Sequence, residues 1–297
     1  MGSDPNSRKW GLTPFAESAR LGRMEQQAQA ERAQRFRALH VSGTFVIANC
    51  WDGGSARILT SLGFPALATS SGASAGTLGR LDGNVSLDEA LAQARTICSS
   101  TSLPVSADLE KGFGDGPEAT AKTIALAAET GLVGGSIEDA TGRKESPIFD
   151  PGIATERVAA AAEAARKLSF PFTLTARAEN YLHGRPDLDD TIKRLQAFER
   201  AGADVLFAPG LPDLAAVRTV CSSLSKPVNF MVGIRGKSFS VAELAQAGVR
   251  RISLAGTLYR AAMTGLADAA REVRESGTFG YLDSSMSGGE YAKYFQG

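Results

Sequence analysis

Six carboxylate side chains lie at the ends of short apolar segments in the first half of the chain, or in the loops just after them. They are Asp52, Asp82, Asp108, Glu110, Glu138 and Asp139. Carboxylates that gather raise one another's pKa, and a bound divalent cation removes the repulsion between them. An all-oxygen ligand set favours Mg²⁺ or Mn²⁺ over zinc. If the fold brings these residues to one rim, they predict a magnesium or manganese site.

Residues suited to binding an anionic substrate occur at similar places. Arg177 lies near the end of the apolar segment 172–178, and its guanidinium can clamp a carboxylate or phosphonate with two parallel hydrogen bonds. Ser71 and the backbone N–H groups of Gly72 and Ala73 can bind the other anionic end, because small residues allow close approach. These residues predict a pocket for a small anionic substrate.

Three further polar or aromatic residues are candidates for contacts with the substrate. Asn229 lies within the apolar segment 227–232. Trp51 and Asp52 follow the segment 45–50, and two interpretations of this pair stay open. They contact the substrate, or Trp51 is a pocket wall and Asp52 caps the helix that begins at the next glycines.

The elements that must position these residues repeat along the chain. Segments with strand composition alternate with Ala- and Leu-rich helical stretches, which predicts parallel βαβ units and an α/β fold. The strands are expected at 45–50, 66–71, 104–109, 134–139, 172–178, 203–209, 227–232 and 250–255. The helices are expected near 54–62, 86–101, 117–130, 154–167, 187–201, 212–222, 240–247 and 257–275.

Eight such units predict a closed (β/α)₈ TIM barrel. An open doubly wound sheet is the competing fold, but its GxGxxG fingerprint does not follow the first strand. In a TIM barrel the active site forms at the carboxyl ends of the strands, where the residues named above fall. The barrel therefore accounts for both the metal site and the anion site.

Three segments flank the barrel, which is predicted at residues 41–276. Residues 1–9 begin MGSDPNS and are interpreted as a cloning remnant. Residues 10–40 are rich in Ala, Glu, Gln and Arg and predict a helix that packs on the barrel exterior or on a partner subunit. Residues 277–297 combine Gly and Ser with aromatic residues and predict a C-terminal arm, either ordered on another subunit or frayed.

Composition excludes several classes of protein. The 297 residues carry 32 Lys plus Arg and 32 Asp plus Glu, so there is no electrostatic case for binding nucleic acid or an anionic membrane surface. No apolar run approaches the roughly 18 residues of a transmembrane helix. The 3 cysteines have no metal-ligand spacing and predict a reducing, cytoplasmic location.

An ordered set of motifs resembles the isocitrate lyase/phosphoenolpyruvate mutase superfamily over residues 40–270. The motifs are SSGAS (70–74), LGRLDG (78–83), ADLEKGFGD (107–115), SIED (136–139), ARAEN (176–180), GADVLF (202–207) and PVNFM (227–231). The resemblance implies a Mg²⁺-dependent barrel whose members break or make C–C or P–C bonds beside a 2-oxo-acid or enol carboxylate. It also implies a homotetramer, a dimer of dimers whose subunits exchange a C-terminal helix.

The resemblance also implies a role for each matching residue. Asp108 would be the principal metal ligand with Glu110 beside it, while Asp82 and Glu138 would hold the metal's waters. The segment Ser71, Gly72 and Ala73 would bind the substrate carboxylate and oxo group, Arg177 would be the clamp and Asn229 a substrate-contacting amide. Arg177, Glu138 and Asp82 are the candidate catalytic residues.

The loop after Asp139 departs from the two well-known branches of the superfamily. It has the sequence ATGRKESPIFD (140–150), without the Cys of the lyase loop and without the Lys and Asn of the mutase loop. Pro209 stands where the lyases carry Glu. The charged residues 143–145 are either a solvated loop or a lid that brings a cation over the substrate. The departures predict a divergent member, nearer to the oxo-acid lyases and decarboxylases.

Three functions compete. The first is a Mg²⁺-dependent lyase that cleaves a C–C bond by decarboxylation, retro-Claisen or retro-aldol chemistry. Its substrate would be a small 2-oxo or 2-hydroxy di- or tricarboxylic acid, such as oxaloacetate or a methylisocitrate-like compound. The second is a P–C bond enzyme of the phosphoenolpyruvate mutase or phosphonopyruvate hydrolase type. The third is a non-catalytic or biosynthetic homologue that uses the barrel to bind a dicarboxylate or to build C–C bonds.

Overall fold

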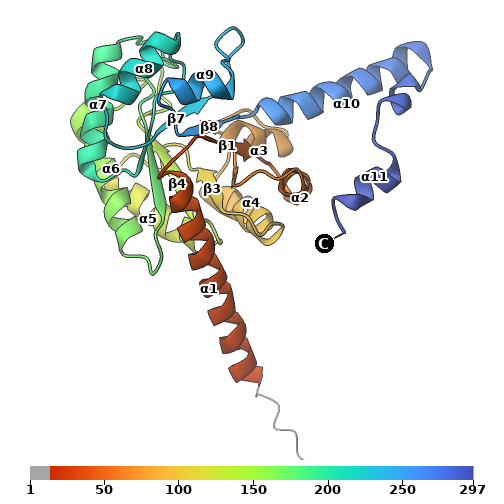
Figure 1. Ribbon diagram of the computed structural model, residues 1–297, viewed down its shortest axis with the longest axis horizontal. Helices are drawn as coiled ribbons and strands as arrows, with labels where there is room; N and C mark the ends of the chain where they lie inside the picture. The colour runs from red at the N-terminus through yellow and green to blue at the C-terminus, as the bar shows by residue number, and fades with distance from the viewer. Residues whose placement is uncertain (1–13, 297) are drawn as a thin grey trace, which may run out of the picture.

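Eight short parallel strands pair in chain order and close on themselves, β1 against β8, in a computed structural model that describes residues 14–296 (Figure 1). The strands are β1 (Phe45–Asn49), β2 (Leu67–Ala68), β3 (Val105–Asp108), β4 (Gly134–Glu138), β5 (Thr173–Arg177), β6 (Val205–Phe207), β7 (Val228–Met231) and β8 (Arg251–Ser253). Each lies within its predicted segment. The TIM barrel is confirmed and the open sheet is excluded.

Helices connect the strands and cover the outside of the barrel. They are α2 (Gly53–Ser61), α4 (Leu87–Ser99), α5 (Pro117–Ala128), α6 (Pro151–Arg166), α7 (Leu188–Ala201), α8 (Leu214–Ser222) and α9 (Val241–Gln246). Local sequence explains where they begin: Ser86 and Ser240 each form a reciprocal cap with a glutamate three residues on, and Pro117 and Pro151 stand at first helical positions. No helix within residues 14–296 is both long and apolar enough to cross a membrane.

The two faces of the strands differ in polarity. Outward residues such as Leu67, Ile137 and Leu174 form the main core with the surrounding helices. Inward residues are mostly small or polar, and Ser106 and Ser136 line a space inside the barrel. Because successive side chains of a strand alternate between faces, this pattern leaves the barrel centre open rather than filled by large aliphatic residues.

Helix α1 (Pro14–Leu39) packs its last turns on the amino-terminal end of the barrel. Ala33 and Phe36 are fully buried there in a small cluster that includes Phe45 and Val133. Gln29 donates to the backbone oxygens of Ala128 and Leu132 at 2.7 and 2.9 Å. The predicted leader helix therefore forms and contacts the barrel, while the cloning-remnant interpretation of residues 1–9 and the first residues of the 10–40 helix lie outside the described residues.

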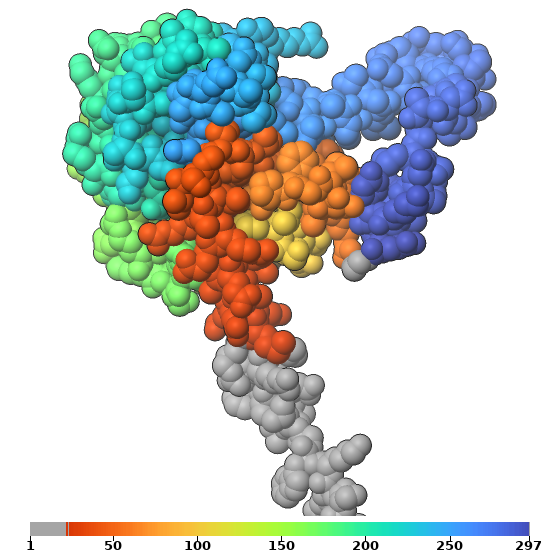
Figure 2. Space-filling view, in the orientation of Figure 1, coloured from red at the N-terminus to blue at the C-terminus, as the bar shows by residue number. Residues whose placement is uncertain are grey.

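Helix α10 (Thr257–Ser276) leaves the barrel instead of covering it (Figures 1 and 2). None of its residues is buried, and it is followed by a short 3₁₀ helix, η1 (Gly280–Asp283), and by α11 (Gly288–Lys293). The α10 helix is therefore not part of the buried core. Leu266 and Phe279 are exposed on this arm. Exchange of the arm between subunits stays a prediction.

Candidate active site

A cavity of about 450 Å³ opens at the carboxyl ends of the strands and continues into the barrel interior. It brings together most of the residues that the sequence predicted for the site: Ser71, Gly72, Ala73, Asp82, Asp108, Arg177 and Asn229. Glu110 shares a small neighbouring space with Ser71 and Asp108. These residues come from the ends of several different strands, as expected for an active site of a TIM barrel.

Asp108 is the last residue of β3 and accepts hydrogen bonds from two other candidate site residues. Its Oδ2 accepts hydrogen bonds from the backbone N–H of Ser71 at 3.3 Å and from the Ser71 hydroxyl at 3.1 Å. Its Oδ1 accepts from Nη1 of Arg177 at 3.0 Å. The candidate metal ligand therefore contacts two of the groups expected to bind the substrate.

Ser71 owes its position to a short helix that the sequence did not predict. The strand expected over 66–71 ends at Ala68, and α3 (Ser71–Thr77) begins where the strand should have continued. The Ser70 side chain caps α3 by accepting from the backbone N–H of Ala73. Gly72 faces Asp82, whose Oδ2 would lie 3.2 Å from a Cβ built at Gly72. The glycine lets the acidic side chain lie against α3.

Arg177 at the end of β5 is a nearly buried cation with three carboxylate partners. Its guanidinium nitrogens lie 3.0 Å from Asp108, 3.2 Å from Glu138 and 2.8 Å from Glu179. Burial alone would lower the pKa of Arg177, but the charges of Glu179, Glu138 and Asp108 outweigh it and raise the pKa. Arg177 is therefore a permanently charged group fixed at the mouth of the cavity.

Glu110 takes a backbone conformation that the sequence did not predict. A regular strand would place Asp108 and Glu110 on one face, but β3 ends at Asp108 and Glu110 has a left-handed φ of 48°. Such a conformation costs a side-chain-bearing residue about 1–3 kcal/mol and must be held by its surroundings. The Glu110 N–H donates to Oδ1 of Asp108 at 3.3 Å, and the Glu110 carbonyl accepts from the backbone N–H of Glu138 at 3.0 Å. Arg157 of α6 holds the loop that follows by donating to the backbone oxygens of Lys111, Gly114 and Asp115.

The carboxylates at the rim hold excess negative charge. Burial, together with the neighbouring charges of Asp108 and Asp82, raises the pKa of Glu110 to about 7. Burial also raises the pKa of Glu138 well above its usual 4.5, although Arg177 opposes the shift. One guanidinium does not compensate these groups, so the rim is suited to a further cation.

Two properties of the rim suit a divalent cation: its donors are carboxylate oxygens, and its negative charge exceeds the positive charge of Arg177. In the described part of the chain, no three His, Cys, Asp or Glu side chains are arranged as a complete metal cage. Mg²⁺ does not require one, because it keeps several waters and binds proteins through one or two carboxylates. Oxygen-only donors at a rim of excess negative charge therefore suit Mg²⁺ or Mn²⁺.

Trp51 and Asp52 are not brought into the cavity. Asp52 caps α2, accepting from the backbone N–H and the hydroxyl of Ser55, both at 2.7 Å. Trp51 packs edge-on against Tyr259, with 5.3 Å between ring centroids. The helix-cap interpretation of Asp52 fits this geometry, and neither residue lines the cavity.

The other polar candidates have structural partners. Asp139 is buried, accepting from Arg194 at 3.1 Å and from the backbone N–H of Glu179 at 2.8 Å. Cys50 is fully buried, and burial raises the pKa of its thiol to about 12, so it packs rather than reacts.

Loop 140–150 is tied to the protein surface. Ala140 and Ile148 form an antiparallel bridge, and the half-exposed Arg143 pairs with Asp115. This geometry fits the solvated-loop interpretation of the charged residues 143–145 better than the lid.

Sequence reasoning missed two residues of the site. Glu179, which is buried beside Arg177, belongs to the motif ARAEN, from which only Arg177 was assigned a role. Arg251 lies on β8 and lines the inner part of the cavity. The signal for Arg251 was the alternation of the segment RRISLA, in which residues 251 and 253 share the inward face.

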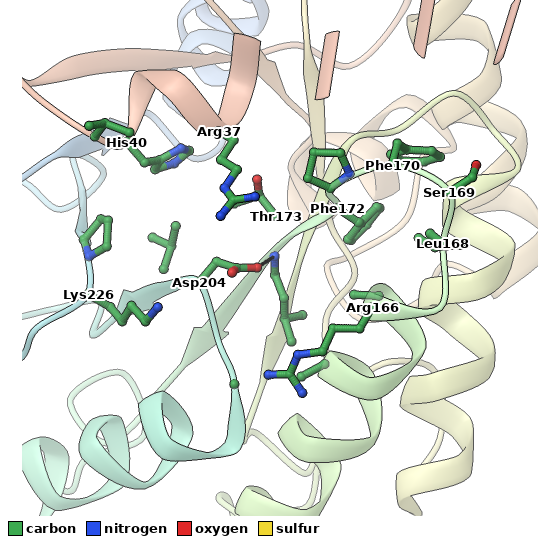
Figure 3. Close-up of a pocket in the computed structure, with 18 residues that line it drawn as sticks. Arg37, His40, Arg166, Leu168, Ser169, Phe170, Phe172, Thr173, Asp204 and Lys226 are labelled. Atoms are coloured by element: carbon green, nitrogen blue, oxygen red, sulfur yellow. Dashed lines mark hydrogen bonds between the residues drawn. The ribbon is translucent and has the colours of Figure 1, made fainter. Parts of the chain in front are cut away.

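A second cavity of about 630 Å³ lies near the amino ends of β5 and β6 (Figure 3). Its walls carry Arg37, Arg166 and Lys226 with Asp204 as a carboxylate. The rim carboxylates and the helix α3 are at the opposite end of the barrel. The larger volume therefore does not make it the candidate active site, since active sites of TIM barrels form at the carboxyl ends of the strands.

A family model, a solved structure and curated relatives that are similar to this chain all carry lyase, mutase or decarboxylase descriptions. The family described as phosphoenolpyruvate phosphomutase matches residues 36–274. A candidate lyase/mutase from Burkholderia cenocepacia J2315 has a crystal structure that is 50% identical, covers 91% of this chain and 98% of its own, and superposes with a TM-score of 0.89. The oxaloacetate decarboxylase of Pseudomonas paraeruginosa is 29% identical over 92% of this chain and 94% of its own. The 2-methylisocitrate lyase of Escherichia coli is 32% identical over 53% of this chain and 54% of its own.

Proposed function

This chain belongs to the phosphoenolpyruvate mutase/isocitrate lyase superfamily, whose members are C–C lyases and mutases, and from that premise we propose that it is a Mg²⁺- or Mn²⁺-dependent lyase. It cleaves a C–C bond in a small 2-oxo or 2-hydroxy di- or tricarboxylic acid. The observation that carries the proposal is the convergence of Ser71, Asp108 and Arg177 in one cavity whose rim carboxylates have raised pKa values.

Each residue has a separate task. Asp108 would hold the metal directly with Glu110 beside it, while Asp82 and Glu138 would accept hydrogen bonds from its waters. Bound Mg²⁺ or Mn²⁺ supplies Lewis-acid stabilisation of the negative charge that develops on the 2-oxo oxygen. Ser71 and the backbone of Gly72 and Ala73 bind the substrate carboxylate. Arg177 orients the substrate through a charged hydrogen-bond pair.

Decarboxylation or retro-Claisen cleavage is the preferred chemistry. A retro-aldol cleavage needs a base and an acid, and the loop 140–150 lacks the cysteine that the lyase resemblance places there. Decarboxylation of an oxaloacetate-like substrate needs no initial proton removal. The similarity to an oxaloacetate decarboxylase over 92% of this chain supports the same choice.

The test is a screen of 2-oxo and 2-hydroxy acids for release of pyruvate, glyoxylate or oxalate. Activity is expected with Mg²⁺ or Mn²⁺, lost in EDTA and restored when metal is added back. Turnover that persists in EDTA would rule out the proposed chemistry. Binding of a dicarboxylate without any turnover would favour a non-catalytic homologue.

A P–C bond enzyme acting on phosphonopyruvate is the second candidate. The matched family, described as phosphoenolpyruvate phosphomutase, favours it. The residue after Asp139 opposes it, because Ala140 stands where the mutases carry Lys, and Ala140 is buried and paired with Ile148. Phosphorus NMR after incubation with phosphonopyruvate separates the two candidates, since only a P–C enzyme yields a new phosphorus resonance.

We also propose that the protein is a cytoplasmic homo-oligomer, a dimer of dimers. The exposed apolar residues of the arm, Leu266 and Phe279, support a second copy of this chain as the partner. All three cysteines are free, as in a reducing compartment.

A further inference from the structure

Among residues 14–296, no carboxylate pairs with the buried guanidinium of Arg251. It is 5% exposed and is the first residue of β8. Its Nε donates to Oδ1 of Asn229 at 2.8 Å and its Nη2 donates to the hydroxyl of Thr175 at 2.9 Å. Within the described residues, Nη1 is buried and has no hydrogen-bond partner. Two N–H groups of a charged side chain are thus left unsatisfied inside the barrel.

This arrangement is costly unless a ligand completes it. A buried charge is normally paired, because removing it from water without compensation costs several kcal/mol. Burial lowers the pKa of Arg251 to about 9. Arg177, by contrast, has three carboxylate partners in the same cavity. The cavity therefore has excess negative charge at its rim and an uncompensated positive charge deeper inside.

The position of Arg251 makes it part of the cavity floor. The cavity lining includes Arg251 together with small residues of neighbouring strands, Ala68, Ser106 and Ser136. Thr175, which accepts from Arg251, precedes Arg177 by two residues on β5. At about 3.3 Å per residue, the guanidinium contacts β5 about 6.6 Å below Arg177 along the strand. A substrate that begins at the rim can extend to this depth.

The neighbours of Arg251 hold it in place rather than neutralise it. Asn229, predicted from the sequence as a substrate-contacting amide, accepts from Arg251 with its oxygen and donates from Nδ2 to the Ser253 hydroxyl at 3.0 Å. These two contacts fix the orientation of the amide. The guanidinium is therefore oriented by neutral groups and keeps its full charge for an incoming anion.

We propose that Arg251 binds the second anionic group of the substrate, a carboxylate or a phosphonate, at the floor of the cavity. The inference rests on the proposed function, in which the oxo-acid end of the substrate lies at the rim. It adds a specificity determinant: acids with one anionic group reach Asp108 and Arg177 but leave Arg251 unpaired, whereas acids with two satisfy both ends. Discrimination is strong at such sites, because the wrong ligand leaves a buried polar group unsatisfied.

Four variants test the role of Arg251. Arg251→Met keeps the volume and removes the charge. Arg251→Lys keeps the charge but lacks the planar guanidinium with its paired N–H donors. Asn229→Asp places a carboxylate next to the guanidinium and should neutralise it with little change of shape. Arg250→Met is the control, because Arg250 directly precedes β8 and donates to the backbone oxygen of Gly43.

Calorimetry with Mg²⁺ compares ligands that differ in the second anion. Malate and phosphonopyruvate are the two-anion probes, and lactate and pyruvate are their one-anion counterparts. Arg251→Met and Asn229→Asp should weaken the two-anion probes about 10- to 100-fold and the one-anion probes less than about twofold. Arg251→Lys should fall between, and Arg250→Met should resemble the wild type. If the Arg251 variants lose affinity for malate alone, the site binds a carboxylate. If they lose affinity for phosphonopyruvate alone, the site binds a phosphonate.

A metal-free readout separates this inference from the proposed function. In EDTA, malate or phosphonopyruvate should raise the thermal unfolding midpoint of the wild type and of Arg250→Met, but not of Arg251→Met. Equal stabilisation of wild type and Arg251→Met, or no response of the wild type to any two-anion probe, overturns the role of Arg251. If the ligand raises the unfolding midpoint only when Arg251 is present, but the protein shows no metal-dependent turnover, the proposed function is contradicted and the anion site at Arg251 is supported.

Discussion

Arg177 and Asp108 form an ion pair across the mouth of the cavity, with 3.0 Å between Nη1 and Oδ1. The pair joins the two functions of the site, since Asp108 is the proposed metal ligand and Arg177 the proposed substrate clamp. The same carboxylate accepts from Ser71 on its other oxygen. A cation held by Asp108 would compete with Arg177 for this carboxylate and would leave the guanidinium more available to an anionic substrate. The two binding events are therefore expected to support each other.

Replacing Asp108 by Asn should abolish metal uptake. The amide keeps the hydrogen bond from Ser71 but removes the negative charge that binds Mg²⁺, so Mg²⁺ affinity in the presence of oxalate should fall at least about 100-fold. Calorimetry measures the uptake and circular dichroism confirms that the barrel is folded. Asp115→Asn is the matched control, because Asp115 lies on the same loop but pairs only with the surface groups Lys111 and Arg143. Unchanged magnesium binding by Asp108→Asn would remove Asp108 as the ligand.

Replacing Arg177 by Met should reduce both stability and substrate binding. The change leaves Glu138 and Glu179 buried without their cation, which should lower the free energy of unfolding by about 3–5 kcal/mol. Urea unfolding measures this loss, and Mg²⁺ should restore more stability to the variant than it adds to the wild type. In turnover assays kcat/KM should fall at least about 100-fold, since a charged hydrogen-bonded contact is lost. A variant with wild-type KM would show that Arg177 does not clamp the substrate.

The sequence predicted the barrel well because its strands are short apolar segments that recur between helical stretches. All eight strands fall inside their predicted segments, and the carboxyl-end rule then selected Asp108, Arg177 and Ser71 without knowledge of any contact. Periodicity and composition are local properties, and these parts of the fold are encoded locally.

The features that the sequence did not predict depend on tertiary contacts, which no local pattern shows. The segment after Ser70 has small residues that suit either a strand or a helix, and the cap from Ser70 decides for α3. Glu110 has a left-handed backbone, and its carbonyl accepts from Glu138, a residue of another strand. The charge of Arg251 is informative only once burial and missing partners are known.

The apolar side of the C-terminal arm should control oligomeric state. Leu266 is 63% exposed on α10, a helix with no buried residue, and a second copy of the chain would cover it. Light scattering should give a multimer for the wild type and a smaller species for Leu266→Glu. Arg271→Glu, which breaks only the exposed pair with Asp268, should keep the wild-type mass. A monomeric wild type would contradict the proposed assembly.

His40 should make the protein less stable as the pH falls from 7 to 5. Burial, with the nearby charge of Arg251, lowers the pKa of His40 from 6.5 to about 3, although the Phe36 carbonyl opposes the shift. Below pH 6.5 the unfolded chain binds a proton that the folded protein excludes, so stability is lost as the pH falls. At pH 5 the expected loss is about 2 kcal/mol, from about 1.4 kcal/mol per pH unit.

Urea unfolding of the wild type and of His40→Gln at pH 7 and pH 5 isolates this contribution. Carboxylates titrate equally in both proteins, so the difference between their pH dependences belongs to His40. His40→Gln should lose about 2 kcal/mol less than the wild type between the two pH values. His183→Gln is the control, because His183 is the other histidine and its side chain is 32% exposed. If His40→Gln and the wild type lose the same stability, His40 is protonated in the folded protein and its burial does not exclude the proton.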